Sequence, residues 1–242
     1  MDPLTRTIVV LIILFLAAFT GSAFGFGDAL LAMPLLTLAV GLPTAVPLVR
    51  LAGSTMSIGV LIGAWRQVDI HAAWRLVVAS IVGVPLGVIL LQLAPTGVVT
   101  AILAVVLIAY GIANLTTLPL PTLGSERTSY IFGFVAGILG GAYNTNGPPI
   151  VMYGVMRGWS PKRFRATLQG YFLPTGFAVL AGQALAGLYT REIWQLYAYS
   201  LPVIGAAVLV GGWMNRRFEA QQFERLVYAL LVAIGVVLLI SG

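Results

Sequence analysis

The sequence contains no cysteine, one histidine (His71) and only seven acidic residues among 242. Without cysteine the chain forms no disulfide, thiolate metal site, iron–sulfur cluster or cysteine nucleophile. One histidine cannot build a histidine-rich metal site, and no Ser/His/Asp set, pair of carboxylates or P-loop accompanies it. We therefore expect neither an enzyme nor a bound metal or cofactor.

Charge of either sign is scarce. Charged residues make up 8% of the chain, whereas a soluble domain carries about 25%. Hydrophobic residues make up 60%, and the mean hydropathy is +1.01. A membrane-spanning helix needs about 20 apolar residues, and charge-free runs such as 76–125 and 128–156 exceed that length. The composition predicts an all-α, polytopic transmembrane protein that contacts membrane lipids.

The apolar segments fall into two sets of five. The first set lies near 7–24, 27–40, 44–64, 74–93 and 97–115, and the second near 128–143, 147–156, 164–188, 194–213 and 223–241. Pro119, Pro121 and Gly124 interrupt the stretch between the sets. We expect a first repeat at 1–118, a linker at 119–127 and a second repeat at 128–242. Segments 27–40 and 147–156 are short, so each is either a half-helix or the return arm of a re-entrant hairpin.

A broken apolar segment followed by an arginine occurs in both sets. Four residue pairs match at one offset of 115 residues: Phe19/Phe134, Gly25/Gly140, Pro34/Pro149 and Arg50/Arg165. An odd number of segments per set inserts the second repeat upside down relative to the first. Broken helices at matching places in two halves indicate the binding site of a secondary transporter, with the breaks meeting near the membrane midplane.

The basic residues are distributed unequally between the two sides of the predicted membrane. Arg6 and Arg191 fall on one side, and ten fall on the other: Arg66, Arg75, Arg127, Arg157, Lys162, Arg163, Arg165, Arg216, Arg217 and Arg225. Cytoplasmic loops carry the excess of Lys and Arg. We therefore expect the basic loops in the cytoplasm, both termini on the other side and 7–24 as a retained first helix. This distribution accounts for the pI near 10, so we expect no nucleic-acid partner.

The sequence Asn144-Thr-Asn146-Gly147-Pro148-Pro149 is the sharpest local signal. Proline is tolerated at the start of a helix, so 147–156 is predicted to begin a half-helix. The positive end of its dipole would then bind an anion, and Asn144 and Asn146 would add amide donors. The alternative is a surface turn between two helices, capped by the asparagines.

The equivalent break in the first half is Gly25-Phe-Gly27-Asp28. The glycine pairs Gly21/Gly25 and Gly137/Gly141 also fit a small-residue packing surface. Asp28 is the only carboxylate well inside an apolar region, and intramembrane acids are functional by default. It could bind a coupling proton or sodium ion or pair with Arg50; at a hairpin mouth it would instead cap a helix.

Arg50 and Arg165 could attract an anion and hydrogen-bond it with both arms of the guanidinium. Gln169, Tyr171, Ser54 and Ser57 follow them on the same segments and could line its path. The alternatives are snorkelling of Arg50 to the nearer face, an interfacial charge at Arg165, and hydrogen bonds between helices for the polar residues.

The residues Gly147-Pro148-Pro149-Ile-Val-Met-Tyr153, followed by Gly158-Trp-Ser-Pro-Lys-Arg-Phe164-Arg165-Ala-Thr167, resemble the second-half signature of the TauE/SafE sulfite exporter family. Gly25-x-Gly27 with Pro34-Leu-Leu, and Gly83-Val-Pro-Leu-Gly87, fit the same pattern, so the resemblance covers essentially the whole chain. Gly147, Pro148, Phe164 and Arg165 match the motif by position. Asp28 stands where many relatives continue a glycine run, and Asn144-Thr-Asn146 is more polar than the usual glycine-rich approach.

The resemblance implies transport of a small anion, such as sulfite, an organosulfonate or a related sulfur compound, across the bacterial inner membrane. We expect a secondary transporter that works by alternating access. The alternatives are an uncoupled anion channel and a membrane enzyme or assembly factor of sulfur metabolism. The anion, its direction, the coupling ion and the oligomeric state stay open. The expected substrate-binding residues are Gly25, Gly27, Arg50, Asn144, Asn146, Gly147, Pro148, Arg165 and Gln169, with Asp28 for the coupling ion.

Overall fold

The protein is all-α, as the composition predicts. The computed structural model describes residues 2–24, 27–64, 70–116, 123, 125–159, 161–215, 228–229, 231–233, 235–237 and 239–240. In these ranges the numbered helices are α1 (Pro3–Phe24), α2 (Asp28–Val40), α3 (Leu42–Ala64), α4 (Ile70–Leu93), α5 (Thr96–Leu115), α6 (Thr128–Tyr143), α7 (Gly147–Met156), α8 (Pro161–Leu185) and α9 (Arg191–Asn215). The described residues from 228 to 240 are also helical.

The helices form a membrane protein. Three of those described are long and apolar enough by length and composition to cross a bilayer: Pro3–Ala23, Ala73–Leu93 and Arg191–Met214. Large apolar side chains face outward along these same helices, among them Ile12, Val82 and Leu209. A water-soluble protein rarely exposes so much contiguous apolar surface, whereas lipid tails cover it without cost.

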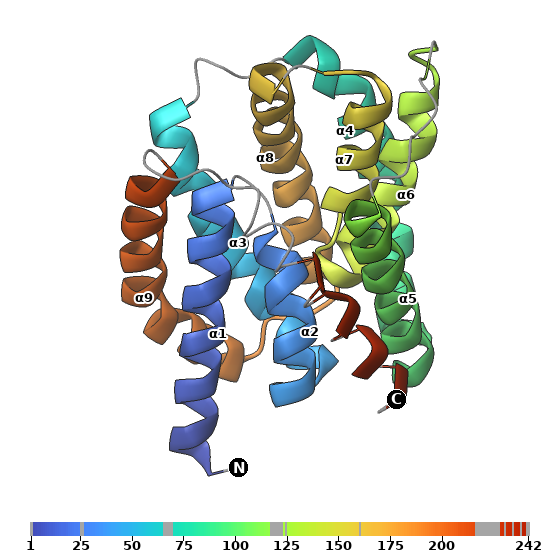
Figure 1. Cartoon of the computed structure of the whole chain (residues 1–242). Helices are drawn as coiled ribbons and strands as arrows, with labels where there is room; N and C mark the ends of the chain where they lie inside the picture. The colour runs from blue at the N-terminus through green and yellow to red at the C-terminus, as the bar shows by residue number, and fades with distance from the viewer. Residues whose placement is uncertain are drawn as a thin grey trace.

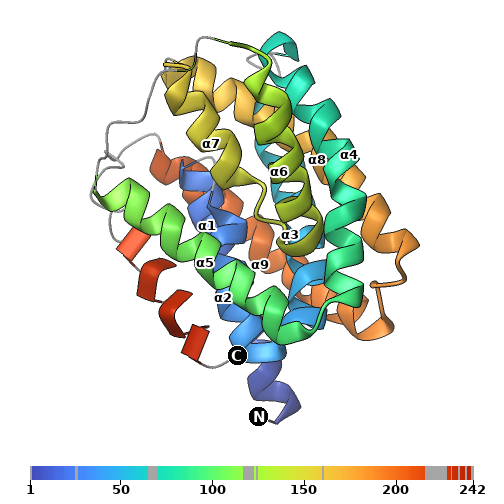
Figure 2. The same cartoon turned by 90° about the vertical axis from the view of Figure 1, so that its right-hand side faces the viewer.

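The two short segments are the return arms of re-entrant hairpins. Helices α2 and α7 have 13 and 10 residues, so they extend about 20 and 15 Å, well short of the hydrocarbon thickness of about 30 Å. Figures 1 and 2 show α2 turning back along α1, and α7 turning back along α6. The α1–α2 hairpin opens towards the end of the molecule that holds the N-terminus, and the α6–α7 hairpin opens towards the opposite end.

The two halves of the chain pack reciprocally. Helix α4 packs on α6 and α8 of the other half, while α9 packs on α1 and α3. Helices α3 and α8 contact each other between these groups. An ion pair joins the starts of two packed helices at each end of the molecule: Arg6 with Glu192 at the starts of α1 and α9, and Arg75 with Glu126 at the starts of α4 and α6.

Glycines bring α4 and α6 into backbone contact. A Cβ atom placed on Gly133, Gly137 or Gly141 of α6 would collide with the backbone of α4, and one on Gly83 or Gly87 of α4 would collide with α6. Small residues permit such close approach between membrane helices. The packing interpretation of Gly137 and Gly141 is therefore confirmed, and the rigid α4–α6 pair holds the second hairpin in place.

Candidate functional site

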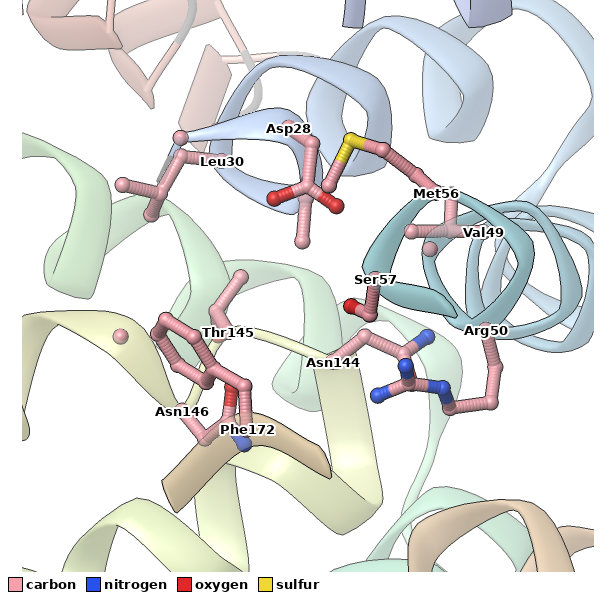
Figure 3. A pocket seen from close by; sticks show the side chains of 14 residues that line it. Asp28, Leu30, Val49, Arg50, Met56, Ser57, Asn144, Thr145, Asn146 and Phe172 are labelled. Carbon is pink, nitrogen blue, oxygen red and sulfur yellow. The ribbon is translucent and has the colours of Figure 1, made fainter. Parts of the chain in front are cut away.

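The tips of the two hairpins enclose a cavity of about 50 Å³. Its wall comes from Gly27–Leu30 of the first tip, residues 144–147 of the second, one face of α3 and Phe172 of α8. A single water needs roughly 10–15 Å³ of such space, so the cavity has room for several waters or one small polyatomic ion. Figure 3 shows side chains from both halves pointing into it.

Arg50 contributes a buried cation whose Nη groups face this cavity (Figure 3). Its side chain is only 8% exposed, and its guanidinium points towards the second tip (Figure 3). Nε donates to Ser54 Oγ at 3.2 Å, and within the described part of the chain the Nη groups have no hydrogen-bond partner. Gly176 of α8 makes room for the guanidinium, since a Cβ there would lie 3.2 Å from Nη2. A buried charge is costly unless it is paired, so this arrangement is suited to an incoming anion.

Asp28 faces the same cavity from the first tip. It is the first residue of α2, and the residue before it, Gly27, takes a left-handed conformation with φ of 96°. The tip lies inside the molecule, so Asp28 is not at a hairpin mouth. A Cβ atom on Gly53 would lie 3.2 Å from Asp28 Oδ2 and 3.6 Å from Arg50 Nη2. The two charges therefore share one space, although no ion pair joins Asp28 to a cation among the described residues.

Asn144 fastens the second tip to its surroundings. Its backbone is left-handed, with φ of 57°, which asparagine tolerates better than most residues. Its amide Nδ2 donates to the Val46 carbonyl of α3 at 2.6 Å, and its Oδ1 accepts from Gln183 Nε2 of α8 at 3.3 Å. The side chain lines the cavity, but its polar atoms are already engaged by the protein.

The other hydrogen-bond donors of the second tip are the Asn146 amide and the Gly147 N–H group. Asn146 Nδ2 makes a long contact of 3.5 Å to Thr175 Oγ1, and its side chain also hydrogen-bonds to the Tyr171 hydroxyl. Gly147 begins α7 at the cavity wall. Pro148 and Pro149 follow and carry no N–H group, so they bring no donor of their own. They fix the start of the helix.

Thr145 is a site residue that the sequence reasoning did not single out. It is 1% exposed and lines the cavity, and its buried hydroxyl has no hydrogen-bond partner among the described residues. A buried hydroxyl left unpaired costs free energy. The signal for it was its position between the two asparagines.

A hydrogen-bond chain leads from Asn144 towards the loop between α8 and α9. Tyr189 in this loop donates to Gln183 Oε1 at 3.0 Å, and Gln183 donates to Asn144. Burial raises the pKa of the Tyr189 hydroxyl to about 12, so it remains a donor at neutral pH. The loop and the second tip are therefore coupled through protein side chains.

The structure describes several of the other expected site residues only in part. Gly25 lies outside the described residues, as do the side chains of Arg165 and Gln169, whose backbone belongs to α8. Arg165 precedes Phe172 by about 10 Å along the helix. Pro148 is buried in the first turn of α7. Tyr171 is buried against Ser80 Oγ at 2.7 Å and does not line the cavity.

These features define a polytopic α-helical membrane protein in which two re-entrant hairpins surround a buried cationic cavity. The model of the sulfite exporter TauE/SafE family matches residues 10–238, and the chain belongs to this family. It is 27% identical over 232 residues to the probable sulfite/organosulfonate exporter TauE of Cupriavidus necator, covering 90% of this chain and 88% of that relative. No solved structure matches the chain. Because the family consists of transporters, the protein is a transporter and not an enzyme, as expected.

Proposed function

We propose that the protein carries sulfite or an organosulfonate across the bacterial inner membrane by alternating access. The observation that carries this proposal is Arg50, a buried guanidinium that faces a cavity of about 50 Å³ between the two hairpin tips. Its Nη groups have no hydrogen-bond partner in the part of the chain that the structure describes. The name of the Cupriavidus relative supplies the chemical class of the substrate.

The cavity offers what a sulfur oxyanion needs. Sulfite and sulfonates both present three oxygens on one sulfur, and the planar fork of Arg50 can bind two of them at once. The Thr145 hydroxyl, the Asn146 amide and the Gly147 N–H at the positive end of the α7 dipole would bind the remaining oxygen. Val49, Met56 and Phe172 in the same wall would contact the organic part of a sulfonate.

Two features of the fold support inverted repeats at 1–118 and 128–242, joined by a linker at 119–127. The hairpins enter from opposite ends, and in each a long helix is followed by a short one: α1 by α2, and α6 by α7 (Figure 1). Helix α4 packs on α6 and α8, and α9 packs on α1 and α3. A two-fold axis that exchanges the two halves would relate these two sets of contacts. In such an architecture one repeat moves against the other around a central site. Arg165 is the counterpart of Arg50 and would attract the anion on the cytoplasmic side.

The charge distribution supports the orientation. Of the ten basic residues that the sequence assigns to one side, Arg75, Arg127 and Arg157 lie at the end that holds the starts of α4 and α6. We propose that this end is cytoplasmic. The termini, and the ion pair of Arg6 with Glu192, would then lie outside.

Counterflow of labelled sulfite in proteoliposomes tests this function. We expect saturable uptake that unlabelled sulfite inside accelerates, which is a property of carriers and not of open channels. Arg50→Gln should reduce the exchange at least about tenfold, because a hydrogen bond to a charged group contributes about 1.5–3 kcal/mol. Arg50→Lys should restore part of it, since lysine keeps the charge but lacks the fork.

The matched control is Arg191→Gln, which removes an exposed arginine at the start of α9. It should exchange sulfite like the wild type. A folded Arg50→Gln protein with wild-type exchange would show that the anion does not bind at this cavity.

A further inference from the structure

The cavity holds one fixed positive charge and one group that can lose its negative charge. Resting on the proposed function, we propose that Asp28 takes up a proton whenever Arg50 binds an anion, so that the protein carries one proton with each monoanion. Arg50 stays charged at every accessible pH. Asp28 is therefore the group in the cavity whose charge can change.

Charge balance is the first argument. In the empty cavity the charges of Arg50 and ionised Asp28 cancel. A monoanion on Arg50 would leave a net negative charge in a small, water-poor space, where like charges repel strongly. A proton on Asp28 restores the balance. The empty and loaded cavities then both carry no net charge, which lets both forms rearrange within the membrane.

The surroundings of Asp28 offer no other way to balance the charge. The groups that face it are Arg50 from α3, uncharged residues of the second tip, Phe172 of α8, and small or apolar residues of α1, α2 and α3: Leu14, Ala17, Ala18, Gly21, Ala32 and Met56. Tyr189 of the loop between α8 and α9 lies within electrostatic reach of Arg50 and is protonated at neutral pH. Among the described residues, Arg50 is thus the one charged partner of Asp28.

The same surroundings favour a proton over a metal cation. Hard cations bind where several oxygen ligands converge. In the cavity wall Asp28 supplies the one carboxylate, beside the neutral hydroxyls of Ser57 and Thr145 and the amides of the second tip. In the part of the chain that the structure describes, no group of three acidic or histidine side chains exists that could hold a metal. The nearby guanidinium would also repel a cation. A proton needs only the carboxylate oxygen.

Replacing Asp28 by asparagine separates coupling from binding. Asparagine has the shape of a protonated aspartate, so Asp28→Asn should still exchange labelled sulfite, at a reduced rate. The variant cannot release a proton. In proteoliposomes with the membrane potential clamped at zero, an acidic outside should drive sulfite accumulation by the wild type and none by Asp28→Asn.

Two controls isolate the protein's contribution. Protein-free liposomes give the pH-dependent distribution of sulfite itself, and methanesulfonate, whose charge does not change near neutral pH, serves as a second probe. Asp2→Asn is the matched variant: Asp2 also stands at a helix start, but it is exposed and its carboxylate accepts from Thr5 N at 3.1 Å. Asp2→Asn should keep the full response to the pH gradient.

The outcomes distinguish the two proposals. A wild-type protein that exchanges neither probe would overturn the proposed function. A wild type that exchanges sulfite but ignores the pH gradient would overturn proton coupling alone. So would an Asp28→Asn protein that still accumulates sulfite in the gradient, or a folded one that has lost exchange altogether, since Asp28 would then act in binding.

Discussion

At the scale of single residues, the cavity is defined by polar groups that the protein leaves without partners. Arg50 is 8% exposed, and its Nη groups receive no hydrogen-bond partner from the described residues. The hydroxyl of Thr145 is buried and also has no partner among them. Native proteins pair nearly all such groups. Two unpaired groups facing one small space are explained if a ligand pairs with both of them during part of the working cycle.

Thr145→Val tests this explanation. Valine has nearly the same shape as threonine, so the variant should be as stable as the wild type or more stable, because removing an unpaired buried hydroxyl removes its cost. The KM for sulfite should rise by about tenfold if the hydroxyl binds the anion, since a hydrogen bond to a charged partner contributes about 1.5 kcal/mol or more. Thermal unfolding in detergent and sulfite exchange measure the two effects.

Thr37→Val is the control for that experiment. Thr37 on α2 also has a buried hydroxyl that no described residue pairs with, but it does not line the cavity. It should show the same stability effect with an unchanged KM. A rise in KM for Thr37→Val as large as for Thr145→Val would refute the assignment of Thr145 to the site.

Much of the candidate site could be predicted from the residue types. Gly27, Asp28, Arg50, Asn144, Asn146 and Gly147 were expected to act together, and the structure places all of them at one cavity. Charged and amide side chains within apolar runs are expensive, which makes them visible in a sequence. The structural role of Asn144 was not visible, because its partners Val46 and Gln183 are 98 and 39 residues away in the chain.

At the scale of helices, the glycine and proline residues predicted where the two short helices begin. The predicted segments 27–40 and 147–156 agree with α2 and α7, because a left-handed Gly27 precedes α2 and Gly147-Pro148 form the first turn of α7, where proline is tolerated. The sequence left open whether these segments were half-helices or hairpin arms. Only tertiary contacts of α1 with α2 and of α6 with α7 could decide this.

The α4–α6 contact makes a testable prediction for helix packing. A Cβ on Gly137 would lie below 3.0 Å from backbone atoms of Ser80, whereas a Cβ on Gly205 of α9 meets no atom within 4 Å. Gly137→Ala should therefore destabilise the protein by about 1–3 kcal/mol. Gly205→Ala should leave stability unchanged or raise it slightly, because alanine favours the helix. Thermal unfolding of the two variants in the same detergent makes the comparison, and equal unfolding temperatures would contradict the packing described here.

At the scale of the whole molecule, helices from both ends of the molecule meet at one central cavity. Each hairpin reaches the cavity from its own end, and each is held by a helix of the other half, α9 for α1 and α4 for α6. The composition predicted a polytopic helical protein with two similar halves. It did not predict that the halves interlock, since reciprocal packing depends on which helix faces fit together and not on hydropathy along the chain.

The central claim is that a small sulfur oxyanion binds where the two hairpin tips meet, against Arg50. A structure determined in the presence of selenite, the selenium analogue of sulfite, tests it most directly, because selenium is identified by its anomalous scattering. We predict one strong selenium peak in the cavity within hydrogen-bond distance of the Arg50 guanidinium and the second tip, and its loss in Arg50→Gln. A selenium site elsewhere in the helical bundle, with the cavity empty at selenite concentrations that inhibit sulfite exchange, would contradict the account.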